Sequence, residues 1–369
     1  MSQRQIILRI YLFFLVFFLA TSIGRGFLSL WYVQNGFSYP QLATYFLIDF
    51  AIPVIVLIMV KSFSTTKSFL VALISEILLM INVSHFFHPL QIYLAGILAG
   101  TTVVFFYVTY NTLFFENTPQ DKRAFSSSLY TLAGPVFNIF VPLLVGFISQ
   151  RWGFPYVFLV SGLILFAALF YIRFLPKIEF HCRLLESLKQ SNRVNFFLLI
   201  IGIREAVAFA GIAIFTLFFI RQPLPYGVYL AYLGFLSTGA TVLLGFLSDK
   251  FKKRTIILYP VSLILAFNLI AIAFTQDLKT WTILSGALAF ISTIAGTFET
   301  TLVLDKTQTV SGGMISREFL LGVGRIIGTV FILISLTLFD SLKMGLILIG
   351  LAYLLFPLSL WLKKTYQPV

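Results

Sequence analysis

Seven ionisable side chains interrupt long runs of apolar residues, and their types are those that exchange protons or attract charged solutes. They are Arg25, Asp49, Glu76, Arg204, Glu205, Glu299 and Arg325. A carboxylate in a buried site can take up and release a proton near neutral pH. An arginine in the same setting can attract an anion. The sequence therefore predicts a path for protons or a small charged solute through the apolar part of the chain.

The same side chains also fit a purely structural reading. Asp49 is able to pair with Arg25, and Arg204 or Arg325 with Glu299, as fixed salt bridges, and Glu299 is also a candidate for a gate near one end of its helix. Neutral polar contacts are expected from Tyr107 and Asn138, although a tyrosine near a helix end is commonly an interfacial anchor. The sequence leaves these alternatives open.

The composition sets the environment of these residues. The chain has 369 residues, of which 59% are hydrophobic and 11% are charged, against about half and a quarter in soluble domains. Lipid is the expected solvent for most of the chain. A charge near the centre of a bilayer costs about 2.5–3.5 kcal/mol on insertion scales, so the seven residues are expected to face protein or water.

Twelve apolar stretches are long enough to be membrane helices, since a bilayer requires about 20 apolar residues. The stretch after the N-terminus is too long for the core of a signal peptide and is read as a retained helix. The predicted spans are 8–33, 41–60, 68–84, 90–115, 125–149, 154–175, 195–220, 226–247, 255–275, 280–304, 317–338 and 342–362.

The basic residues alternate between the two sets of loops. With a cytoplasmic N-terminus, nearly all arginines and lysines outside the spans fall on the cytoplasmic side, and the exceptions are Arg151, Arg221, Lys279 and Lys343. Short cytoplasmic loops retain such residues. The formal charge of +13 therefore reflects the orientation of the chain in the membrane, which argues against a nucleic-acid partner. Both termini are expected in the cytoplasm of a multi-pass cell-membrane protein.

The longest of these basic connections divides the chain. Residues 1–175 and 195–369 each contain six predicted helices, and 176–194 joins them as an amphipathic helix on the membrane surface or as a disordered linker. Weak internal matches support a duplication, because Gly134 lies over Gly324 at an offset of 190 and other pairs lie at 187 and 189. The sequence predicts an all-α membrane protein of two pseudo-symmetric six-helix halves.

One loop carries a recognisable motif. Gly245, Asp249, Lys250, Lys253 and Arg254 follow the spacing G-x-L-x-D-[RK]-x-x-[RK]-[RK] between helices eight and nine. The chain thereby resembles the major facilitator superfamily, whose fold has twelve helices in two halves.

In that family the acid of the motif docks on a helix start in the opposite half, which implies a contact of Asp249 with the start of helix five at Ser126, Ser127 and Ser128. The equivalent loop of the first half, 61–67, has no aspartate. Its Lys61 or Lys67 is expected to pair with Glu318, unless Glu318 caps its own helix.

The resemblance implies a secondary active transporter rather than an enzyme. It implies alternating access for a small organic solute with proton coupling, efflux being preferred over uptake. Arg25 and Arg325 would attract an anionic substrate, and Asp49, Glu205 or Glu299 would accept protons. A membrane-embedded lipid-modifying enzyme and a transporter-like sensor or assembly protein remain as alternatives. No metal or other cofactor is expected, and the partners are the solute, H+ and the lipid bilayer, with the protein a monomer.

Overall fold

The computed structural model describes residues 3–85, 88–118, 123–248, 254–306 and 309–363, and these residues are mainly helical. The first half contains α1 (Gln3–Arg25) with α2 (Leu28–Gln34), α3 (Tyr39–Met59), α4 (Thr65–Ser84), α5 (Gln91–Val103) with η1 (Val104–Val108) and α6 (Thr109–Glu116), α7 (Arg123–Trp152), and α8 (Phe154–Tyr171) with η3 (Ile172–Phe174). The second half contains α10 (Asn195–Ala206) with η4 (Val207–Gly211) and α11 (Ile212–Phe219), α12 (Pro223–Ser248), α13 (Arg254–Ile272), α14 (Leu278–Lys306), α15 (Val310–Phe339), and α16 (Lys343–Tyr353) with α17 (Leu355–Lys363).

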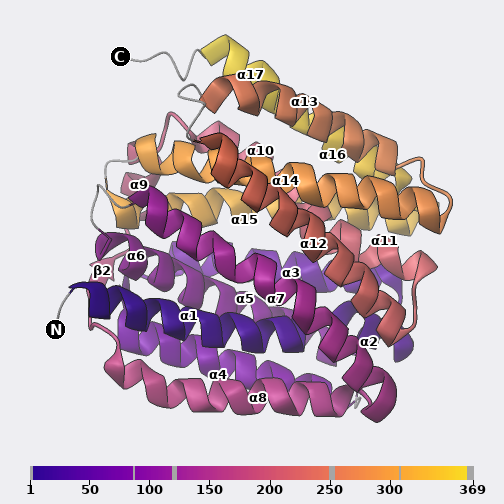
Figure 1. Cartoon of the computed structure of the whole chain (residues 1–369), viewed down its shortest axis with the longest axis horizontal. Coiled ribbons are helices and arrows are strands. Elements are labelled where there is room, and N and C mark those ends of the chain that lie inside the picture. Colours follow the sequence, from indigo (N-terminus) through magenta and orange to yellow (C-terminus); the bar gives the residue numbers. More distant parts are fainter. Residues whose placement is uncertain (1–2, 86–87, 119–122, 249–253, 307–308, 364–369) are drawn as a thin grey trace.

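Each of the twelve predicted spans falls on one of these helices or on a broken pair of them. Within the described residues, nine helical segments are long and apolar enough to cross a bilayer, and shorter apolar helices cover 258–272 and 343–359. In Figure 1 the helices lie roughly side by side, so the apolar stripe of one packs on the next while the outer faces expose leucine, isoleucine and phenylalanine. Exposed apolar side chains of this kind suit a lipid solvent.

The two halves meet along two helix pairs. α7 packs on α12, and α3 packs on α15. Figure 1 shows the first half below and the second half above, with α4 and α8 at the outer edge of one and α13, α16 and α17 at the outer edge of the other. α7 and α15 occupy equivalent places in the repeat, and both are 30 residues long, beginning 187 residues apart.

The interface between α7 and α12 requires small residues. A Cβ atom added to Gly234 would lie 2.3 Å from the backbone oxygen of Asn138, and one added to Gly227 would lie 2.3 Å from that of Pro142. Close approach of backbones through glycine is a common way for membrane helices to associate. Asn138 is thereby fixed at the line where the two halves touch.

The first, fourth and seventh spans are irregular. The first span breaks between α1 and α2, and the equivalent span of the second half contains the π-helical turn η4. The fourth span contains a second π-helical turn, η1. Such turns are rare and occur often at functional sites. They change the direction of the side chains that follow.

The connection between the halves is more structured than a single amphipathic helix. It forms the strand β2 (Glu179–His181) and the short helix α9 (Leu184–Gln190). β2 pairs antiparallel with β1 (Ser62–Ser64), with Phe180 opposite Phe63. β1 lies in the first-half loop that lacks the aspartate of the motif. The strand pairing therefore ties the connection to the first half at the end of the bundle that we name the linker end.

Candidate functional site

A cavity of about 720 Å³ lies between the halves. That volume falls within the range of sites for small organic molecules, about 300–1,000 Å³. Its walls come from α1, α2, α3, the fourth span, α7, the seventh span, α12 and α15, and no described residue of α14 lines it. The charged side chains among the described lining residues are Arg25, Asp49, Glu205, Arg317, Glu318 and Arg325.

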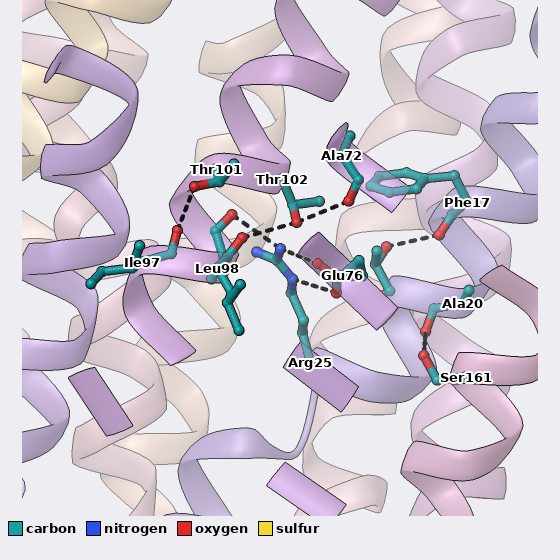
Figure 2. A network of polar contacts seen from close by, with 12 residues as sticks. Phe17, Ala20, Arg25, Ala72, Glu76, Ile97, Leu98, Thr101, Thr102 and Ser161 are labelled. Atoms are coloured by element: carbon teal, nitrogen blue, oxygen red, sulfur yellow. Dashed lines mark hydrogen bonds and ion pairs between the residues drawn. The ribbon is translucent and has the colours of Figure 1, made fainter. Parts of the chain in front are cut away.

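Arg25, the last residue of α1, carries the first of these charges. Arg25 donates a hydrogen bond from Nε to Oε1 of Glu76 at 2.8 Å, and its Nη2 contacts both Glu76 Oε2 and the backbone oxygen of Ala99. Figure 2 shows the guanidinium of Arg25 aimed at Glu76 across the helices. Glu76 is fully buried, whereas 21% of the Arg25 side chain is exposed. The expected pair of Arg25 with Asp49 is not the one that forms.

A second ion pair joins two helices of the second half. Arg325 on α15 donates from Nε and Nη2 to Oε2 of Glu205 on α10, at 2.9 and 2.6 Å. The guanidinium carbon of Arg325 lies 5.9 Å from the ring centre of Phe50 and 5.3 Å from that of Phe209. Because aromatic faces attract cations, residues of both halves fix the position of Arg325.

Next to this pair, Arg317 Nη1 donates to Oε1 of Glu318 at 2.6 Å, and Oε2 of Glu318 lies 3.9 Å from Arg325. Glu318 therefore has arginine partners from its own helix, and the expected pairing with Lys61 or Lys67 is not found. Lys61 instead contributes its backbone oxygen to a bond from the amide of Cys182, at 2.8 Å. The strand pairing holds the loop on the linker, and Phe63 of the loop packs in one buried cluster with Ile315 of α15.

A fourth ion pair lies outside the main cavity. Arg204 Nη2 donates to Oε2 of Glu299 at 2.9 Å, and the hydroxyl of Tyr353 donates to Oε1 of Glu299 at 3.1 Å. Arg204 and Glu299 are both about 5% exposed. This pair matches the salt bridge that the sequence allowed, and its burial between α10, α14 and α16 makes it a bond that holds the second half together.

Asp49 differs from every other charged residue in the cavity. It is 9% exposed, and its Oδ1 is buried without a hydrogen-bond partner. In the described part of the chain it takes part in neither a hydrogen bond nor an ion pair, although the charges of Arg25, Glu76 and Arg325 act on it. It lies at the middle of α3, with its side chain at the cavity wall.

The structure brings together most of the predicted site residues. Tyr107 on η1 and Asn138 on α7 line the cavity with Arg25, Asp49, Glu205 and Arg325, whereas Arg204 and Glu299 do not. Sequence reasoning missed Arg317 and Glu318 as cavity residues because they stand close to the end of the predicted span. It also missed Glu76 as the partner of Arg25, although the charge inside an apolar run was visible.

The motif residues lie at the edge of the described part of the chain, between α12 and α13. Asp249, Lys250 and Lys253 are outside the described residues, and for Gly245 and Arg254 only the helical backbone is described. The side chains of Ser126, Ser127 and Ser128 are also outside the described part. The expected contact of Asp249 with the start of α7 stays a prediction.

The halves also touch beyond the two ends of the cavity. At the end opposite the linker, the Tyr39 hydroxyl donates to the backbone oxygen of Leu217 at 3.1 Å and accepts a bond from Arg221 at 3.1 Å. Gln34 Nε2 adds a bond to the backbone oxygen of Arg221 at 2.9 Å.

At the linker end, a buried apolar cluster joins both halves and the connection between them. It consists of Leu57, Phe63, Val104, Val108, Phe180, Cys182 and Ile315, and we call it the linker-end cluster.

Comparison with known proteins agrees with this architecture. The sequence profile of the Major Facilitator Superfamily matches residues 10–329. The human organic anion transporter MFSD10 (TETRAN) superimposes with a TM-score of 0.68 at 10% identity, covering 98% of this chain and 100% of that chain. A variant of the nucleoside transporter NupG gives 0.68 at 9% identity, with the same coverage. No curated protein sequence matches the chain.

These findings define the class of protein. The fold is that of a membrane transporter with two pseudo-symmetric six-helix halves, as the sequence predicted. The chain belongs to the major facilitator superfamily.

Proposed function

We propose that the chain is a secondary active transporter that moves a small organic solute across the cell membrane by alternating access. The cavity between the halves carries this proposal, because six charged side chains reach it from helices of both halves. A site at the interface of two repeats is open to one side or the other as the halves rock. The linker end is placed in the cytoplasm, in keeping with the distribution of lysine and arginine.

Proton movement is proposed to drive transport, with Asp49 as the proton carrier. Its carboxylate faces the cavity and has no hydrogen-bond partner in the described structure. A carboxylate without a fixed partner gains or loses a proton without breaking a salt bridge, whereas Glu205 and Glu299 are each held by an arginine. Efflux is the proposed direction, because Gly134-Pro135 of α7 resembles part of the glycine-rich signature of antiporters in this family.

Roles follow for the remaining residues. Arg25 with Glu76 and Arg325 with Glu205 fix the cavity walls, Tyr107 and Asn138 offer neutral polar contacts, and Arg204 with Glu299 braces the second half. By the resemblance of its loop to the family motif, Asp249 with Gly245, Lys250, Lys253 and Arg254 is proposed to hold the cytoplasmic gate.

Alternating access can be tested without knowing the solute. Cys182 is the only cysteine of the chain, so Cys182→Ser provides a background for a single cavity cysteine at Ser22. A membrane-impermeant maleimide should label Ser22→Cys from either side in oriented vesicles. Ser84→Cys, at the end of α4 away from the linker, is the control that should react from one side. Labelling of Ser22→Cys from one side alone, whatever the conditions, would exclude alternating access.

A further inference from the structure

The charges of the cavity do not cancel. Three arginines line its described part, and each is held by one glutamate: Arg25 by Glu76, Arg325 by Glu205, and Arg317 by Glu318. Asp49 is the acid that remains after these pairs are made. The described residues therefore leave one negative charge in excess at the cavity wall.

The surroundings of Asp49 make its negative charge unfavourable in free energy. It is nine-tenths buried, and its Oδ1 lies inside the protein without a donor. A buried charge is normally paired and hydrogen-bonded, and without a partner it is destabilising. Because the chain supplies no such partner among its described residues, a positive group that enters the cavity would meet an acceptor that is already desolvated.

An anion would meet the opposite situation. Arg25 and Arg325 each already donate two hydrogen bonds to a carboxylate. An anionic ligand would meet arginines whose charge a carboxylate already balances, and would also stand near an unpaired Asp49. Like charges in a site of low dielectric repel strongly. The expectation of an anionic substrate, which rested on Arg25 and Arg325 alone, does not agree with this pairing.

The rest of the wall is suited to an apolar body. Phe46 and Phe50 stand three residues before and one residue after Asp49 on α3, and Phe18, Phe209 and Leu230 come from other walls. Aromatic faces attract cations as well as apolar groups. The cavity thus combines one unpaired carboxylate with a mainly apolar and aromatic surface.

We infer that the cavity binds a monovalent organic cation with an apolar or aromatic body, its protonated amine lying against Asp49. The inference rests on the proposed function, since it names the class of solute for that same cavity. If this inference is correct, the cavity distinguishes ligands of the same size and shape by their charge.

Three ligands of the same size separate charge from shape. 4-Phenylbutylamine is a cation at neutral pH, 4-phenylbutyrate is an anion and 4-phenylbutanol is neutral. Isothermal titration of the protein in lipid nanodiscs at pH 7 should give an affinity for the amine at least about tenfold above those for the acid and the alcohol, which corresponds to about 1.4 kcal/mol. The reason is that opposite charges attract strongly in a desolvated site, and only the amine brings a positive charge. Equal affinities, a preference for the acid, or no binding of the amine would overturn the inference.

Substitutions test whether Asp49 is the residue that causes the preference for the amine. Asp49→Asn should lower the affinity for the amine by at least about tenfold and leave that for the alcohol unchanged, which also shows that the cavity is intact. Asp49→Glu should keep most of the preference. Glu116→Gln, which removes an exposed acid at the end of α6, should have no effect.

A preference for the amine that survives Asp49→Asn would also refute the assignment. The transporter proposal has its own criterion in the labelling of Ser22→Cys. If that residue is labelled from both sides while the amine is not preferred, the substrate class is wrong and the transporter proposal stands. If it is labelled from one side only, the transporter proposal fails whatever the titration shows.

Discussion

Among the ion pairs of the described residues, Arg25 and Glu76 form the one in which the two partners differ most in exposure. Glu76 is fully buried on α4, while Arg25 reaches the cavity from the end of α1. Removing one partner of a buried pair costs about 3–5 kcal/mol, because the other charge is left without a partner. Removing both with apolar residues of similar size is far less costly.

Arg25→Met is therefore expected to lower the thermal stability of the detergent-purified protein strongly, and Arg25→Met with Glu76→Met to recover most of the loss. Asp49→Asn is the matched control, since it removes a charge that has no partner and should not destabilise. Unfolding followed by intrinsic fluorescence measures all three. Equal destabilisation by Asp49→Asn and Arg25→Met would contradict the pairing described here.

At this scale the sequence identified the charged residues but not their partners. A charge inside an apolar run is visible in any membrane helix, which is why Arg25, Asp49 and Glu205 were found. Arg25 pairs with Glu76, 51 positions away, because α4 packs so that Glu76 faces α1. The rotation of one helix about its axis relative to another depends on the packing of all its neighbours, and no local pattern records it.

At the scale of elements, the linker is the feature that joins the halves. β2 pairs with β1, Phe180 stacks on Phe63 with ring centres 5.5 Å apart, and Gln190 accepts a bond from Thr309 at the start of α15. The helix spans were predictable from apolar runs of bilayer length. The strands were not, because three residues carry no period and β1 forms only where β2 meets it.

The reactivity of the Cys182 thiol depends on the contact between the linker and the first half. Its thiol lies in the linker-end cluster against the backbone oxygen of Leu57, and burial raises the pKa of the Cys182 thiol to about 11. The reactive thiolate is scarce below that pKa. At pH 8 maleimide should therefore react roughly two orders of magnitude more slowly than with an unperturbed cysteine, whose pKa is about 8.5, and the rate should rise with pH toward 11.

Phe180→Asp should open the linker-end cluster and speed this reaction at pH 8. Glu179→Gln, which alters an exposed residue of the same strand, should leave the rate unchanged. The rates are followed by mass spectrometry of the intact protein. A fast reaction in the unaltered chain, or a rate unaffected by Phe180→Asp, would show that the cluster does not protect the thiol.

At the scale of the whole molecule, contacts between the halves lie at both ends of one cavity. Tyr39 contacts Arg221 and Leu217 at the end opposite the linker, and the linker-end cluster joins the halves at the other end. Rocking of the halves requires that these two sets of contacts do not break together. Because the contacts are polar bonds at one end and apolar packing at the other, either set can break while the other set remains.

The most direct test measures distances across both ends of the same protein. Spin labels at Asn35 and Gln222 span the end opposite the linker, and labels at Lys67 and Thr309 span the linker end; all four residues are exposed. Double electron–electron resonance in nanodiscs should show two populations at each end, with the long distance at one end accompanying the short distance at the other.

Asp49→Asn, which mimics the protonated acid, should shift the populations at the two ends in opposite directions. One fixed distance at both ends, or parallel changes at the two ends, would contradict a transporter that works by alternating access.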